Sequence, residues 1–253
     1  MDIAYRSPLV EFFRRGEVAQ DVRLLAARGV LAPRAHEQLA LLLLLTRDTD
    51  PEVARTADAT LGAIPRAALA GFIARSDVGD DVRAFFAARG VAPAAVPSEE
   101  ATEPLLDRDE DTRVADDGLS PLQRIAAMSI SQKLSLAMRG SREERAILIR
   151  DPNKVVAVAV LSSPKVSDAE VESIARMPNV SEDILRIISG ARQWMKNYAI
   201  VAALTRNAKT PVAIAMNLLS RLNDRDLRLL SIDRNVADVL RITARKKLVL
   251  EKR

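Results

Sequence analysis

The feature that most constrains the fold is an internal repeat in the C-terminal half of the chain. A shift of 43 residues places residues 155–175 on residues 198–218. Helical units that recur about every 20 to 50 residues cannot bury an apolar face alone, so they stack on their neighbours as a solenoid. The residues that coincide under this shift are Val155 with Tyr198, Val158 with Val201, Leu161 with Leu204, Ser167 with Thr210, Val171 with Ile214, Ser181 with Asp224 and Ile184 with Leu227.

Helix-start signals accompany the repeat. A serine followed three residues later by glutamate can form a capping box, which satisfies two free backbone donors at the start of a helix. A cap residue followed by proline at the first helical position is a second strong start signal. The sequence contains the pairs Ser141 with Glu144, Ser167 with Glu170, Asp50 with Pro51, and Thr210 with Pro211.

Two stretches carry a resemblance to a known class of proteins. "RDPNKVVAVAVLSSPKVSDAEVESIARMPNVSEDIL" (150–185) and "TRNAKTPVAIAMNLLSRL" (205–222) resemble HEAT-like and leucine-rich-repeat-variant α-solenoids, which favour turns such as 151–153 and 207–211 ahead of a helix. The resemblance covers about residues 141–250 and implies a right-handed superhelix of short helices used for binding. Some members carry a cysteine-ligated cluster, and helical-repeat DNA glycosylases use several aromatics around a catalytic acid. No functional residue is carried over from either group, because this chain has no cysteine and one tryptophan.

Composition supports the same fold class. Hydrophobic residues make up 48% of the chain and aromatic residues 3%, so the core must be largely aliphatic. Ala, Leu, Arg and Glu favour helix. Composition therefore favours an all-α fold, and the resemblance implies that it is a HEAT-like right-handed α-solenoid; we expect two helical blocks joined by an acidic linker. About six short helices are expected in the N-terminal block.

Charge divides the chain into three segments. Residues 1–97 carry 12 basic and 12 acidic residues, and residues 98–120 carry nine acids and two arginines. Residues 121–253 carry 24 basic and 13 acidic residues. The expected organisation is an N-terminal helical domain (1–97), an acidic, disordered linker (98–120) and a basic C-terminal helical-repeat domain (121–253). The linker is also expected to contact the basic domain within the chain.

Several classes of chemistry are poorly supported. Cysteine is absent and His36 is the one histidine, so thiolate metal sites are excluded and imidazole catalysis has little basis. Asp107, Asp109 and Asp111 copy the start of a calcium loop, but Thr112 and Gly118 stand where that loop needs glycine and glutamate. We expect no enzyme activity, no cofactor and no metal site, and a structural role for His36.

Membrane association is not expected either. The longest apolar run, Leu39 to Leu45, has seven residues, against the roughly 20 that a membrane-spanning helix needs. The N-terminus shows no secretory signal pattern. The sequence therefore predicts a cytoplasmic protein.

The basic C-terminal domain carries the functional prediction. The favoured hypothesis is a non-enzymatic scaffold or adaptor that binds a protein partner, with an acidic partner suited to the charge. The predicted partner-binding residues are Trp194, Arg192, Lys196, Arg206, Lys209, Arg241, Arg245, Lys246 and Lys247. The alternative is nucleic-acid binding through phosphate contacts by Arg186, Arg192, Lys196, Arg206, Lys209, Arg221, Arg241, Arg245, Lys246 and Lys247.

Trp194 is the residue that the repeat does not explain. The 43-residue shift assigns Tyr198 to the apolar position of Val155, so its ring is expected in the packed interior. Trp194 falls on Asp151, where the other unit has no apolar residue. It either packs over Tyr198 within the turn or stands beside Arg192 and Lys196 as an exposed anchor for a partner.

Overall fold

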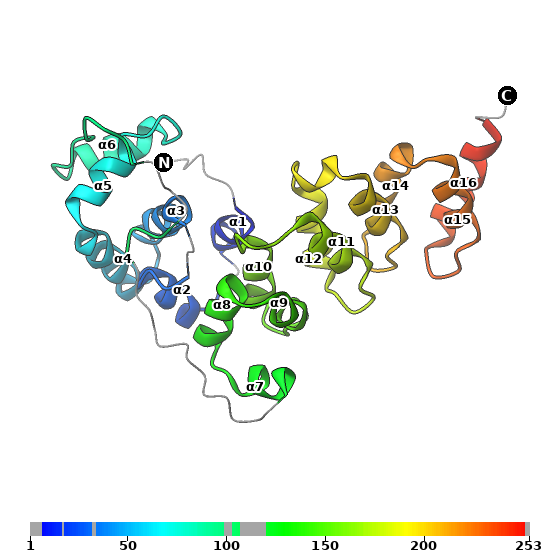
Figure 1. Ribbon diagram of the computed structural model, residues 1–253, viewed down its shortest axis with the longest axis horizontal. Coiled ribbons are helices and arrows are strands. Elements are labelled where there is room, and N and C mark those ends of the chain that lie inside the picture. The colour runs from blue at the N-terminus through cyan, green and yellow to red at the C-terminus, as the bar shows by residue number, and fades with distance from the viewer. Residues whose placement is uncertain (1–6, 17, 32–33, 99–102, 107–119, 251–253) are drawn as a thin grey trace. The chain divides into compact units, whose positions relative to one another are not determined.

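The chain folds as an all-helical protein. The computed structural model describes residues 7–16, 18–31, 34–98, 103–106 and 120–250. Within these ranges there are sixteen α-helices, two short 3₁₀ helices and no strand, which confirms the all-α prediction. The contacts group the chain into unit 1, residues 1–148 and 153–164, and unit 2, residues 149–152 and 165–253 (Figure 1).

Unit 1 contains ten helices. The six helices expected in the N-terminal block are all present, and four further helices from the predicted C-terminal domain join them. Their bounds are α1 Pro8–Arg14, α2 Gln20–Ala27, α3 Ala35–Leu45, α4 Pro51–Ala63, α5 Arg66–Ile73, α6 Asp80–Ala87, α7 Pro121–Ala127, α8 Ile130–Arg139, α9 Arg142–Leu148 and α10 Lys154–Ser162.

Two helices form the interior of unit 1. Helix α3 carries the longest apolar run of the chain, and α10 is buried from Val155 to Ser162. Helix α1 packs on both of them, and its Leu9 backbone N–H donates to the Ser162 hydroxyl at 3.2 Å. A helix that is apolar all round must be covered on all sides. Helix α1 supplies part of the cover for α10, so residues early in the sequence pack against residues 154–162.

The division of the structure therefore differs from the charge-based boundaries at residues 97 and 121. Charge follows surface residues, whereas the grouping of helices follows buried faces. Helices α7–α10 belong to the basic part of the sequence, but the apolar face of α1 packs on α10 and places them in unit 1. The chain passes between the two units within residues 148–165.

The described residues of the predicted linker belong to unit 1 and form hydrogen bonds with its N-terminal helices and the turn after α5. The Ser98 backbone N–H donates to the Gly71 carbonyl at 3.0 Å, and Arg75 donates to the Ser98 carbonyl at 2.9 Å. The buried Gln38 amide donates to the Leu106 carbonyl at 2.7 Å and accepts from its N–H at 3.0 Å. These residues are thus held by hydrogen bonds, while most of the segment 98–120 lies outside the described residues.

Unit 2 contains helices that alternate in direction. Turns 191–197 and 219–223 lie on one edge of the unit, and turns 177–181, 207–211 and 233–237 lie on the other (Figure 1). The helix bounds are α11 Asp168–Arg176, α12 Glu182–Gly190, η1 Trp194–Lys196, α13 Tyr198–Arg206, α14 Val212–Leu218, η2 Leu219–Arg221, α15 Asp224–Ile232 and α16 Asp238–Leu250.

Four helix ends in unit 2 share one geometry. At each of them the backbone turns to an extended conformation and the N–H returns to the carbonyl three residues earlier; the end residues are Met177, Ala191, Asn207 and Asp233. The residue three positions further on is buried in every one of these turns, namely Val180, Trp194, Thr210 and Val236. This ending reverses the chain with no left-handed glycine.

Most of the predicted caps are present. Ser167 with Glu170 forms a capping box, Ser141 with Glu144 makes both hydrogen bonds of one, and Asp50 caps α4 ahead of Pro51. The prediction for Thr210 is wrong: the cap position of α14 is Pro211, and Thr210 stands one residue earlier with its hydroxyl unused.

The spacing of equivalent positions also differs from the expected 43 residues. Asn153 and Asn197 cap α10 and α13 in the same way and stand 44 residues apart, whereas the caps Ser181 and Asn223 stand 42 apart. The 43-residue shift averages these two spacings. Tyr198 therefore corresponds to the exposed Lys154 rather than to the buried Val155.

None of the helices found in the described ranges combines the length and the apolar character needed to cross a membrane. Solenoid handedness is not tested by these observations and stays a prediction.

Glu37 makes the stability of unit 1 dependent on pH. Burial raises the pKa of Glu37 to about 7, although hydrogen bonding to Ser7 and the charge of Arg34 oppose the shift. The folded state then holds more protons than the unfolded state between pH 4.5 and about 7. Its free energy of unfolding falls as pH rises through that range, by about 3 kcal/mol in total, and levels off above it.

We expect Glu37→Gln to remove this decline, because an amide of the same shape stays neutral. Urea unfolding of both proteins from pH 5 to pH 8 measures the difference, with the exposed Glu52→Gln as control. A decline that persists unchanged in Glu37→Gln would contradict this interpretation.

Thr210→Val is expected to stabilise unit 2. The Thr210 side chain is buried, and its hydroxyl has no hydrogen-bond partner among the described residues. Valine keeps the shape and removes the unsatisfied polar group, so the free energy of unfolding should rise by about 1 kcal/mol. The reverse change in the matching turn, Val180→Thr, should lower it by a similar amount. Thermal unfolding measures both, and a loss of stability in Thr210→Val would count against the account of this turn.

Candidate functional site

A polar cavity of about 310 Å³ lies in unit 2. Helices α13 and α15 run in the same direction, with α14 between them in the sequence, and α11 packs on the other side of α13. Small side chains on α13 leave space that a larger residue would fill. The residues that line the cavity are Arg176, Ala202, Ala203, Arg206, Asn207, Asp226 and Asp233.

Side-chain contacts join α13 to α15 at both ends. At the first turn of α13 the Tyr198 hydroxyl donates to Asp226 and accepts from the Asn223 backbone N–H at 3.2 Å. At the last turn the Arg206 Nε lies 3.9 Å from Asp233. Tyr198 and Arg206 are eight residues apart, so the two contacts are separated by about 12 Å along the helix. Ala202 lies midway between them on the same face of α13.

Asn207 fixes the end of the cavity. Its side-chain amide donates to the Ala175 carbonyl at 2.7 Å and to the Met177 carbonyl at 3.0 Å, and its oxygen accepts from the Lys209 backbone N–H at 3.0 Å. The Asn207 side chain is therefore fully engaged. It ties the last residues of α11 to the last residues of α13 and keeps the lining arginines in place.

The cavity presents charges of both signs. Arg176 pairs with Glu172 and is two-thirds exposed at its side chain, and Arg206 is about half-exposed and loosely paired. Asp226 and Asp233 supply carboxylate acceptors. Burial, together with the hydrogen bond to Asp226, raises the pKa of Tyr198, so the phenol stays a neutral donor at neutral pH. Such a lining offers donors and acceptors for a polypeptide, while its carboxylates repel phosphate groups.

The structure does not gather the predicted site residues in one cluster. Arg206 lines the cavity, and Lys209 lies on the same edge of unit 2, in the turn after it. Arg192 and Lys196 are exposed in the turn 191–197 on the other edge. The predicted residues are thus split between two edges.

The cations of α16 are largely engaged by their own surroundings. Arg241 pairs with Asp238, Arg245 donates to the Ser231 carbonyl at 3.1 Å, and Lys247 donates to the Leu219 carbonyl at 3.2 Å. Lys246 is exposed and has no ion-pair partner within the described ranges. The observed contacts therefore explain much of the charge on this helix as local stabilisation.

The structure distinguishes the two interpretations of Trp194 and changes the one made for Tyr198. Trp194 is 3% exposed within η1, so it does not stand as an exposed anchor; burial in the turn, the other interpretation, fits. Tyr198 is 40% exposed, and the expectation that its ring is interior was wrong. The cause is the 44-residue spacing, which assigns Tyr198 to the first, outward position of α13.

Sequence reasoning missed the two alanines of the lining and four of its polar residues, Arg176, Asn207, Asp226 and Asp233. The sequence did carry a signal for the two lining arginines, because Arg176 and Arg206 each stand directly before one of the shared helix ends. The aspartates gave no separate signal, because Asp226 lies in the first turn of α15, where acids are common on any helix.

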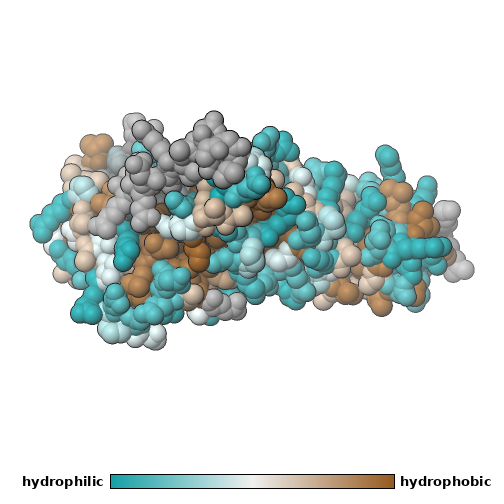
Figure 2. Space-filling view, turned by 90° about the horizontal axis from the view of Figure 1, so that it is seen from below, coloured by the Kyte–Doolittle hydropathy of each residue, from teal (hydrophilic) through white to brown (hydrophobic). Residues whose placement is uncertain are grey.

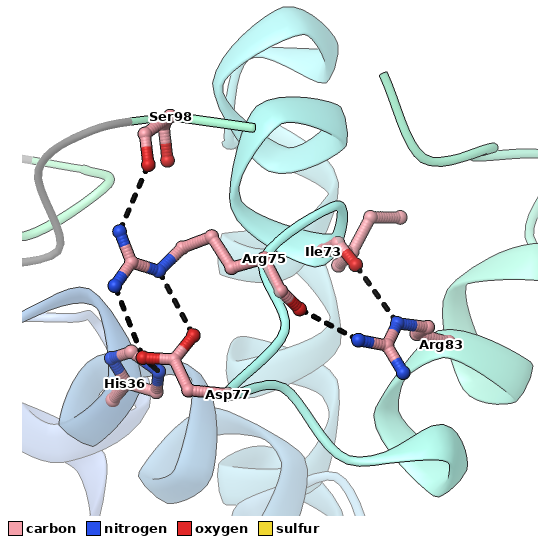
Figure 3. Close-up of polar contacts among 6 residues, drawn as sticks. All are labelled: His36, Ile73, Arg75, Asp77, Arg83 and Ser98. Carbon is pink, nitrogen blue, oxygen red and sulfur yellow. Dashed lines mark hydrogen bonds and ion pairs between the residues drawn. The ribbon is translucent and has the colours of Figure 1, made fainter. Parts of the chain in front are cut away.

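His36 belongs to a structural cluster in unit 1. Its Nε2 lies 3.3 Å from Asp77, which also forms a two-pronged ion pair with Arg75, and Arg75 reaches the Ser98 carbonyl (Figure 3). Burial lowers the pKa of His36 despite the opposing charge of Asp77. Its ring packs edge-on against Phe72 with centroids 4.6 Å apart. The cluster ties α3 to the turn after α5, as the structural interpretation expected.

The calcium-like segment that begins at Asp107 lies outside the described residues. Elsewhere in the chain, within the ranges that the structure describes, no three His, Asp or Glu side chains gather as a metal site would require.

Comparisons with protein-family models, with curated proteins and with solved structures give no match to this chain.

Trp194→Ala is expected to lower the free energy of unfolding of unit 2 by about 3 to 5 kcal/mol, because it removes a buried aromatic side chain. Tyr198→Phe removes only an exposed hydroxyl and should cost about 1 kcal/mol or less. Thermal unfolding of the two variants measures the contrast. Equal effects would contradict the assignment of Trp194 to the interior.

Proposed function

We propose that the protein is a non-enzymatic, HEAT-like helical-repeat scaffold and that the cavity of unit 2 binds a protein partner. The observation that carries the proposal is the cavity itself. Its lining residues come from α11, α13 and α15 and from the residues that end α13 and α15, and two side-chain contacts, Tyr198 with Asp226 and Arg206 with Asp233, join α13 to α15.

The mixed charge of the lining favours a polypeptide over a nucleic acid. Peptide groups and polar side chains offer both donors and acceptors, so they can match the arginines and the aspartates at the same time. A phosphate backbone offers acceptors alone, and Asp226 and Asp233 would oppose it. The split of the basic residues between two edges also gives no single track for a nucleic-acid backbone.

The repeated helix ends support the scaffold part of the proposal. Stacked helical units of this kind create extended surfaces, because each unit contacts its neighbours and leaves one face open. A right-handed superhelix, implied by the resemblance to HEAT-like and leucine-rich-repeat-variant proteins, belongs to the proposal on the same basis.

Capture from cell lysate with the full chain as bait, with and without nuclease, tests the proposal. We expect enriched protein to survive nuclease treatment. Loss of all enrichment on nuclease treatment would contradict protein binding and favour the nucleic-acid alternative.

Cavity variants locate the binding site. Arg206→Glu reverses a lining charge, and Ala202→Trp fills the space, so each should weaken binding of the captured protein by about tenfold or more. Arg186→Glu is the matched control, because Arg186 is exposed, lies outside the cavity lining and pairs with Glu182. Dissociation constants from titration of the purified pair give the readout. If the Ala202→Trp variant and the unaltered chain bind the captured protein with equal affinity, the cavity is excluded as the binding site.

A further inference from the structure

Helix α16 exposes an apolar stripe that its own unit does not cover. Val239, Ile242 and Val249 are 55%, 50% and 62% exposed. Together with Lys246 they are spaced by three, four and three residues, so the four side chains share one face of the helix. Figure 2 shows apolar residues at the surface, among hydrophilic ones, at the end that carries α15 and α16.

The stripe is separate from the face that holds α16 in place. Leu240 and Ala244 are buried, and α16 packs on α15. Substitutions in the stripe therefore leave the internal packing of unit 2 intact. Neighbouring α15 adds a further exposed apolar residue, Ile232.

The charge along this face is positive. Lys246 lies within the stripe, and the exposed Arg245 is next to it. The acid at the start of the helix, Asp238, is paired with Arg241. A partner that covers the stripe must therefore bring apolar side chains and negative charge together.

We propose that the stripe Val239, Ile242, Lys246 and Val249 is the docking surface for an acidic amphipathic helix of a partner protein. An apolar face with side chains at i, i+3 and i+7 matches the spacing of the stripe, and glutamates beside that face would meet Arg245 and Lys246. The surface lies on α16 and shares no residue with the cavity. The inference rests on the proposed function only in assigning polypeptide binding to unit 2.

A second copy of this chain is a poorer occupant. Two α16 helices that pack face to face would bring Arg245 and Lys246 of each copy near the same cations of the other. Like charges in an interface oppose association and favour other partners. The charge of the stripe therefore selects an acidic helix over self-association.

A displayed library of amphipathic helices tests the proposal against the full chain. Its members keep Leu at i, i+3, i+7 and i+10 and carry either Glu or Lys at the flanking positions. We expect selection to enrich Glu. Enrichment of Lys, equal recovery of both, or no recovery above background would overturn the proposal.

Fluorescence anisotropy with the selected Glu peptide, or a designed Glu peptide of the same pattern, locates the contact. Ile242→Glu should abolish binding of the peptide. Lys246→Glu should weaken the affinity for the Glu peptide by about tenfold and strengthen the affinity for its Lys counterpart. Lys209→Glu, the same charge change at an exposed residue on a different turn, should leave both affinities unchanged. Binding that resists Ile242→Glu would overturn the proposal.

Two further measurements separate the alternatives. Ala202→Trp should leave peptide binding intact, so failure of the cavity proposal and failure of this one are distinguishable. In sedimentation, the unaltered chain should show no self-association that is lost in the Ile242→Glu variant. A dimer that depends on Ile242 would assign the stripe to a second copy and overturn the proposal.

Discussion

The helix ends of unit 2 are the constraint on which the rest of its structure depends. The same backbone hydrogen bond ends a helix at Met177, Ala191, Asn207 and Asp233, and the residue three positions later is buried each time. Short helices that end in this way alternate in direction, and neighbouring ones pack on one another, as α11 does on α13 and α15 on α16. The turns lie on two edges of the unit (Figure 1), which determines which residues of different helices meet.

The cavity is built from these same ends. Arg176 and Arg206 immediately precede two of them, and Asn207 and Asp233 are themselves the end residues. Each turn buries its fourth residue but places no such requirement on its first. The first residue and the one before it can therefore be polar, and in two of the turns they line the cavity. Ala202 and Ala203 contribute the small side chains of the lining.

Sequence alone predicted the fold class and several individual helix starts, because caps act locally. Asp50, Ser141 and Ser167 each satisfy backbone groups within three residues, and no distant contact can alter that requirement. The register of the repeat could not be predicted to the residue. The spacing between equivalent caps is one residue longer than 43 at Asn197, before α13, and one residue shorter at Asn223, before α15. A uniform 43-residue shift conceals both differences. The interpretations of Tyr198 and Thr210 failed for that reason.

Only the structure shows which helices form each unit and where the cavity lies. Charge suggested a boundary around residues 98–120, yet α1 reaches α10 through contacts between residues about 150 positions apart, such as Leu9 with Ser162. No local pattern signals such a pairing. The cavity likewise depends on α13 and α15 together, and the basic residues that dominate the sequence are mostly engaged in local contacts or lie on different edges.

Hydrogen exchange of the full chain, with and without its captured protein partner, tests the central claim most directly. The account predicts slower exchange of backbone amides in α13, α15 and the turn 207–211, with the amides of α1–α9 unchanged. Unchanged exchange throughout α13 and α15 in the saturated complex would contradict it.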